Sequence, residues 1–193
     1  MVEEWRRNKY GGLFRVGEIY NNINTENYKD DFNNIDNEAK NVIKAYTDEN
    51  SYYNYDRING SINSFGINGA NEEVQRRARI IEKAINQNEI KENSYVYRVI
   101  DKRDILKDSK GYYIQNQGFT STSATENIPV DFIDSENKIK IKIQVQKGTK
   151  ALYIGERTEA IVNEQEFLFG LNKRIDIKEN YFNKNIINGK MRK

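Results

Sequence analysis

Four polar side chains in the second half of the chain carry the groups best suited to chemistry: Arg98, Ser121, Glu164 and Glu166. Arg98 stands within the apolar run 95–100, where a planar guanidinium favours a bidentate anion such as a phosphate or a carboxylate. The same arginine could instead form a structural ion pair with one of the two glutamates. The sequence therefore predicts either an anion-binding arginine or a buried ion pair at this position.

Glu164 and Glu166 are two residues apart, so in a strand their carboxylates project from the same face, roughly 6–7 Å apart. Two acids at the end of an apolar strand indicate either a catalytic pair or a solvated edge strand. The same alternation places Ser121 and Ser123 on one face of their segment and Thr122 on the other. Small hydroxyls on a cleft face can hold a carboxylate or a ribose hydroxyl, although an ordinary strand also fits this segment.

The composition excludes several classes of chemistry, because the chain has no His and no Cys. Ser-His-Asp catalysis, thiolate nucleophiles and cysteine metal sites are ruled out. A zinc site would need carboxylates alone, which is unusual, so we expect no metal. The net charge of +2 gives no reason to expect nucleic acid as a partner. No apolar run approaches the ~20 residues of a membrane span, and the first seven residues lack the apolar region of a signal peptide, so we expect none here.

Two periodicities divide the chain and predict an α+β fold. Helical spacing of apolar residues appears over 36–47, a short helix is expected within 51–70, and Asn71 is expected to cap a strong helix that ends at 86–88. From residue 94 the period changes to two, as in strands. Strands are expected at 95–100, 111–114, 119–123, 138–146, 151–154, 164–171, 174–177 and 181–187. Their lack of intervening helices favours a mixed or antiparallel sheet.

The order of these segments resembles the arginine–serine–glutamate class of mono-ADP-ribosyltransferases, in particular the enzymatic domains of clostridial binary toxins and vegetative insecticidal proteins. Five short motifs carry the resemblance, and together they extend over most of the chain. They are Ala45-Tyr46-Thr47 with Tyr55 and Ile58-Asn59, the helix Ile81 to Ile85 leading to Tyr97-Arg98, Ser121-Thr122-Ser123, Lys147 to Ala151, and Glu164 to Leu168.

The resemblance implies that the chain uses NAD as a substrate and cleaves the bond between nicotinamide and ribose. Glu166 would stabilise the oxocarbenium-like transition state, as a carboxylate does in glycoside hydrolysis. Ser121 would orient Glu166 or the ribose, and Arg98 would hold the pyrophosphate. Glu164 would engage the incoming nucleophile. In this family a glutamate at that position accompanies arginine acceptors, and a carboxylate pairs with a guanidinium better than an amide does.

Further NAD contacts are implied around the serine motif. The residues expected to bind NAD are Arg98, Gly118, Phe119, Ser121, Phe132 and Glu166. Residues 124–137 would form a loop over NAD, in which Phe132 either packs on nicotinamide or anchors the loop. Gly118 stands where the family commonly has a polar contact. Residues 155–163 would form the target-recognition loop. Tyr46 and Tyr55 could close the cleft from the helical side or belong to the core.

We therefore expect residues 1–193 to form a single ADP-ribosyltransferase domain, with a mainly helical part (1–93) packed on a two-sheet β core (94–193) that holds NAD. The expected activity is transfer of ADP-ribose to an arginine of a target protein. The alternatives are an NAD glycohydrolase and a catalytically degenerate binding module. The resemblance implies a toxin or effector that is secreted or injected and acts in the cytosol of a target cell, with a possible delivery component or immunity protein as partner.

Overall fold

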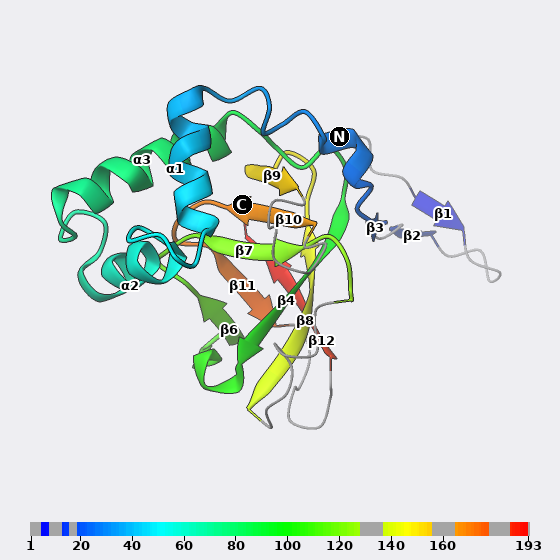
Figure 1. Cartoon of the computed structure of the whole chain (residues 1–193). Coiled ribbons are helices and arrows are strands. Elements are labelled where there is room, and N and C mark those ends of the chain that lie inside the picture. Colours follow the sequence, from blue (N-terminus) through cyan, green and yellow to red (C-terminus); the bar gives the residue numbers. More distant parts are fainter. Residues whose placement is uncertain are drawn as a thin grey trace.

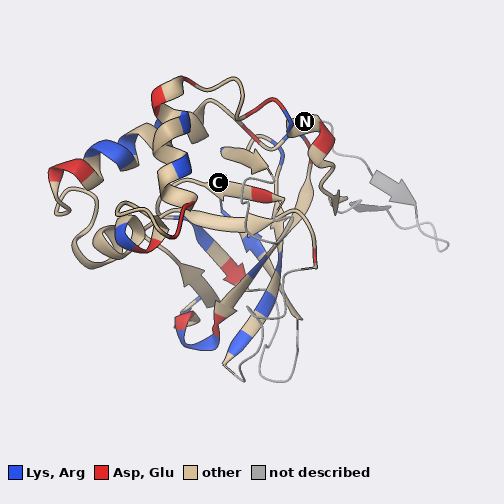
Figure 2. Cartoon of the chain, in the orientation of Figure 1, with Lys and Arg blue, Asp and Glu red and all other residues tan. Residues whose placement is uncertain are grey.

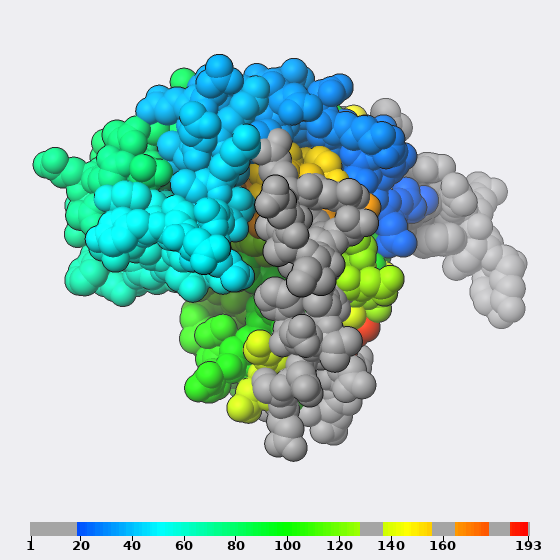
Figure 3. Space-filling view, viewed as in Figure 1, coloured from blue at the N-terminus to red at the C-terminus, as the bar shows by residue number. Residues whose placement is uncertain are grey.

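The computed structural model describes residues 5–7, 13–15, 19–127, 137–155, 165–177 and 186–192. Three helices lie together on one side of a mixed β-sheet (Figure 1). In the space-filling view they form a continuous layer at one side of the molecule (Figure 3). The α+β fold expected from the two periodicities is therefore confirmed.

The helices begin where the sequence supplies a capping side chain. The N-cap residues are Asp36, Asn54 and Asn71, and each accepts a hydrogen bond from a backbone N–H of the first helical turn, at 2.8–3.1 Å. The helices are α1 (Asn37–Thr47), α2 (Tyr55–Phe65) and α3 (Glu72–Asn86). Two short 3-10 turns, η1 (Thr25–Tyr28) and η2 (Lys102–Asp104), complete the described helical segments. The three predicted helices are confirmed.

Ten of the described strands form one sheet in the order β5-β6-β11-β12-β8-β4-β7-β10-β9, with β3 paired to β4. Their bounds are β3 (Asn21–Asn22), β4 (Ser94–Asp101), β5 (Leu106–Asp108), β6 (Gly111–Gln115), β7 (Thr120–Ser123), β8 (Lys138–Val145), β9 (Ala151–Gly155), β10 (Glu166–Phe169), β11 (Arg174–Ile177) and β12 (Ile186–Met191). A separate pair joins β1 (Trp5–Arg7) to β2 (Leu13–Arg15). The pairs β12/β8 and β3/β4 are parallel, and the others are antiparallel.

The sheet changes direction where β4 meets β7, because a single residue pair, Tyr97 with Ser123, joins these two strands. In Figure 1 the strands β7 and β10 run across β4 and β8. The described core strands thus form one mixed, mostly antiparallel sheet that bends at this crossing, where a two-sheet core was expected. The last strand begins at Ile186, so the prediction for 181–187 is only partly tested, since 178–185 lie outside the described residues.

Two hydrophobic cores lie on opposite faces of β10 and β9. On β10, Phe167 and Phe169 pack into the core shared with β4, β8, β11 and β12, whereas Leu168 packs into the core under the helices. Each such side chain contributes ~1.5–3 kcal/mol when fully buried. A slip of one residue would exchange the two faces of β10, and the buried side chains therefore hold its register. The predicted alternation of β8 is confirmed, with Ile139, Ile141, Ile143 and Val145 buried.

Charges of both signs are interspersed on the face shown in Figure 2. Among the described residues, no helix has the length and apolar character needed to cross a membrane.

Candidate active site

Strand β7 lies between β4 and β10 and brings three of the predicted site residues together. Arg98 is on β4, Ser121 is on β7 and Glu166 is the first residue of β10. The three side chains are therefore neighbours although 68 residues of sequence separate the first from the last. Their order in the sheet matches their order in the chain.

The hydroxyl of Ser121 donates a hydrogen bond from its Oγ to Oε1 of Glu166. In the register of β7 and β10, Glu166 lies opposite Ser123 and Leu168 lies opposite Ser121, so all four side chains share one face. Thr122, on the other face, is buried. The predicted alternation of this segment is confirmed, and it directs the serine hydroxyl toward the carboxylate.

The guanidinium of Arg98 is anchored to the same strand. Its Nη1 donates to the backbone carbonyl of Ser121 over 2.8 Å. Burial lowers the pKa of Arg98, although the nearby charges of Asp104 and Glu166 oppose that shift. An arginine stays protonated under such conditions. Among the described residues no carboxylate lies within ion-pair distance of Arg98, and its described hydrogen-bond partner is the Ser121 carbonyl.

The helical layer reaches this site through Tyr46 on α1 and Asn59 on α2. Tyr46 is buried, and its hydroxyl accepts a hydrogen bond from Nδ2 of Asn59 over 3.0 Å. Burial raises the pKa of Tyr46 most, and the negative charge of Glu166 raises it further, while the Asn59 hydrogen bond and the charge of Arg98 lower it. The phenol therefore stays protonated and lies within the electrostatic reach of both site residues.

Two asparagines of α2 hold the segment that leads into β7, and the sequence motifs did not predict this contact. Asn59 accepts from the backbone N–H of Phe119 over 2.9 Å and donates to its carbonyl over 3.3 Å. Asn63, one turn later, accepts from the N–H of Gly118 over 3.0 Å. A Cβ at Gly118 would lie 2.5 Å from Oδ1 of Asn59, so glycine permits this close approach. The i, i+4 spacing of the asparagines is the sequence signal that could have indicated the contact.

The remaining predicted residues differ in what the structure says of them. Phe119 is fully buried, with its ring packed edge-on against Tyr46 at 5.8 Å. Its contribution to NAD binding, like that of Gly118, stays a prediction. Glu164, Phe132 and residues 156–163 of the predicted target-recognition loop (155–163) lie outside the described residues, and Gly155 ends β9. Tyr46 is a core residue and does not line the surface, whereas Tyr55 is 39% exposed.

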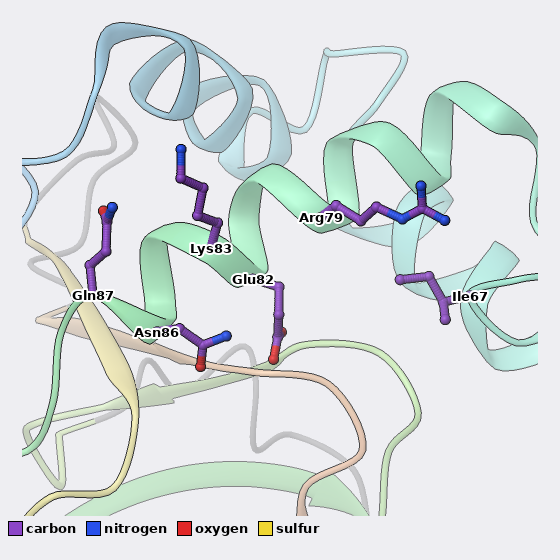
Figure 4. A pocket seen from close by; sticks show the side chains of 6 residues that line it. All are labelled: Ile67, Arg79, Glu82, Lys83, Asn86 and Gln87. Carbon is purple, nitrogen blue, oxygen red and sulfur yellow. The ribbon is translucent and has the colours of Figure 1, made fainter.

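A groove of about 480 Å³ lies along α3, and none of the three site residues lines it. Figure 4 shows its lining side chains: Ile67, Arg79, Glu82, Lys83, Asn86 and Gln87. Glu82 points toward the turn after β10 and accepts the backbone N–H of Leu171 over 3.1 Å. We interpret this carboxylate as a structural anchor for that turn. No cluster of metal-ligating side chains occurs within the described ranges.

Comparison with protein families identifies the class of this chain. The sequence model of the ADP-ribosyltransferase exoenzyme family matches residues 20–192. The chain therefore belongs to the ADP-ribosyltransferase exoenzyme family, as its motifs suggested. A search of curated protein sequences found no match.

Solved structures show the same fold at low sequence identity. The enzymatic component C2-I of the Clostridium botulinum C2 toxin (pH 3.0) is 18% identical with a TM-score of 0.69, and the match covers 99% of this chain and 54% of C2-I. Plx2a, an ADP-ribosyltransferase toxin from Paenibacillus larvae, is 19% identical with a TM-score of 0.69, covering 88% of this chain and 92% of Plx2a. C3stau2 from S. aureus, solved with NAD, is 19% identical with a TM-score of 0.64, covering 92% of this chain and all of C3stau2. The chain thus spans about half the length of C2-I.

Proposed function

We propose that this protein transfers ADP-ribose from NAD to an arginine side chain of a target protein and releases nicotinamide. The observation that carries the proposal is the linked set of Arg98, Ser121 and Glu166 on three adjacent strands. The family match and the NAD-bound relative support NAD as the substrate. The acceptor is inferred from Glu164 by resemblance alone.

Each described residue has a role that follows from its chemistry. The guanidinium of Arg98, which has no carboxylate partner among the described residues, suits the pyrophosphate, because arginine binds phosphate oxygens in a bidentate manner. The carboxylate of Glu166 would stabilise the positive charge that develops on the ribose as its bond to nicotinamide breaks. Ser121 holds that carboxylate through Oε1. Glu164 would bind the acceptor guanidinium and take the proton that it loses when the new bond forms.

We also propose that residues 1–193 act as a single domain, because β9 and β10 contribute side chains to both hydrophobic cores. The toxin relatives support action in the cytosol of a target cell after secretion or injection. The name of C2-I as one component of a toxin is consistent with a separate delivery component here. Binding of an immunity protein stays a prediction. It also stays a prediction that the reaction involves no nucleic acid and no metal.

The decisive experiment incubates the purified protein with labelled NAD and host-cell lysate, follows nicotinamide release, and identifies the modified residue by mass spectrometry. Glu166→Gln should lower nicotinamide release by at least ~100-fold, the usual effect of removing a group that stabilises transition-state charge. Glu164→Gln should abolish transfer to arginine yet leave some NAD hydrolysis. Glu72→Gln, an exposed carboxylate on α3, is the matched control and should behave as the wild type.

The outcomes separate the proposed function from its alternatives. Nicotinamide release with no labelled protein would indicate an NAD glycohydrolase. Absence of release under all conditions would indicate a binding module. Label on asparagine or cysteine, with none on arginine, would contradict the predicted acceptor. Full transfer by Glu166→Gln would contradict the assigned roles.

A further inference from the structure

Tyr46 is a core tyrosine whose hydroxyl bonds to Asn59, and Asn59 in turn holds the backbone just before β7. Its side chain is only 2% exposed, in the middle of α1. Its hydroxyl accepts the Asn59 amide, and none of the described residues accepts the hydroxyl proton. Its ring packs edge-on against Phe119, at an interplanar angle of 87°. Tyr46 thus contacts the helical layer by a hydrogen bond and the approach to β7 by its ring.

The amide of Asn59 extends this contact to the backbone of Phe119, the residue that precedes β7. Its Oδ1 and Nδ2 bond to the N–H and the carbonyl of Phe119, as a neighbouring strand would. Nδ2 therefore serves both the Phe119 carbonyl and the Tyr46 hydroxyl. The N–H and the carbonyl of Phe119 fix which way the amide faces, and the bond to the Tyr46 hydroxyl is a third contact that limits the movement of the Asn59 side chain. Ser121 follows two residues after Phe119, on a strand whose path these bonds determine.

The charges of Glu166 and Arg98 act on the Tyr46 hydroxyl. The charge of Glu166 raises the pKa of Tyr46 and the charge of Arg98 lowers it, although burial is the largest effect. The hydroxyl of Tyr46 is therefore within the electrostatic reach of both groups that the proposed reaction uses.

We propose that Tyr46 is a positioning residue for the reaction: through Asn59 and Phe119 it fixes β7, so that the Ser121 hydroxyl holds the carboxylate of Glu166 in its working orientation. This role rests on the proposed function of Glu166. It makes helix α1, which contributes no predicted catalytic residue, a determinant of turnover. Tyr46 acts at a distance from the substrate, and substrate affinity should depend on it little.

The test compares Tyr46→Phe with Tyr28→Phe. Both tyrosines are at most 2% exposed. The Tyr46 hydroxyl accepts a hydrogen bond from Asn59 Nδ2 over 3.0 Å, and the Tyr28 hydroxyl accepts one from the backbone N–H of Lys91 over 2.8 Å. Tyr28 lies in the other core, so its variant measures the cost of losing a buried hydroxyl. Tyr46→Phe should lower kcat for nicotinamide release roughly tenfold, as expected for loss of one positioning hydrogen bond, with KM for NAD little changed.

A double-mutant cycle with Ser121→Ala distinguishes positioning from general structural support. If Tyr46 acts through the Ser121–Glu166 hydrogen bond, Tyr46→Phe should have little further effect on kcat once Ser121 is alanine. Tyr28→Phe should lower the unfolding midpoint without changing kcat. If Tyr46→Phe does not fold, Asn59→Ala provides the second variant, because it removes the amide through which Tyr46 would act on Phe119.

Two results would overturn the inference, and they are distinguishable. A Tyr46→Phe protein that loses stability like Tyr28→Phe but keeps the wild-type kcat would refute the positioning role while leaving the proposed function intact. Additive losses in the double-mutant cycle would also refute it. A wild-type protein that releases no nicotinamide would instead refute the proposed function, and the positioning role with it.

Discussion

Replacing Ser121 with alanine tests the central contact of the site, because the variant loses the hydrogen bond to Glu166 and keeps the backbone. A hydrogen bond to a charged group contributes about 1.5–3 kcal/mol. At about 1.4 kcal/mol for each factor of ten, its loss should lower kcat for nicotinamide release by roughly 10- to 150-fold. The carbonyl that binds Nη1 of Arg98 belongs to the backbone and survives the substitution. KM for NAD should therefore change little.

Ser123→Ala is the matched control for this prediction. Ser123 is on the same strand and the same face, and its Oγ accepts the backbone N–H of Thr125 over 3.1 Å. It should retain a near-wild-type kcat. Initial rates of nicotinamide release at saturating NAD, measured by chromatography for both variants, provide the comparison. A kcat for Ser121→Ala within twofold of the wild type, or an equal loss in Ser123→Ala, would refute the reasoning.

Two further substitutions address stability and its pH dependence. Gly118→Ala would place a Cβ 2.5 Å from Oδ1 of Asn59 and should lower the free energy of unfolding, measured with denaturant, by ~1–3 kcal/mol. Gly60→Ala, in open space within α2, is the control and should raise it by ~0.5–1 kcal/mol. An unchanged free energy of unfolding for Gly118→Ala would contradict the close contact. Burial raises the pKa of Asp31 above its usual 3.8 despite its bond to Lys91, and one carboxylate oxygen has no partner among the described residues. The folded state then binds the proton more readily, so stability from Asp31 should rise as pH falls through the raised pKa, and equilibrium unfolding of Asp31→Asn should lack that rise.

Local features of the fold were predictable because short-range physics determines them. The capping side chains Asp36 and Asn71 mark the starts of α1 and α3, where backbone N–H groups lack partners within the helix. The alternation in 138–145 predicted the buried face of β8. In the same way, strand alternation predicted that Ser121 and Ser123 of β7 share one face.

Other features could not be predicted, because they depend on which segments meet. The 3-residue strand β5 and the 2-residue strand β3 are too short to show a period. The choice between an ion pair and a free guanidinium for Arg98 required its surroundings, which show a carbonyl as its described partner. The asparagine contacts of α2 were missed since a polar helix face usually indicates solvent.

The sequence by itself determined the chemical groups of this protein, the faces on which they lie and, through the order of its motifs, its family. Those properties follow from residue type and from the periods of helix and strand, which need no tertiary contact. Only the tertiary structure decided that β7 lies between β4 and β10, so that the serine of one strand bonds to the glutamate of the next. Pairing between segments far apart in the chain is set by the packing of both hydrophobic cores together, a property of the whole molecule that no single segment contains.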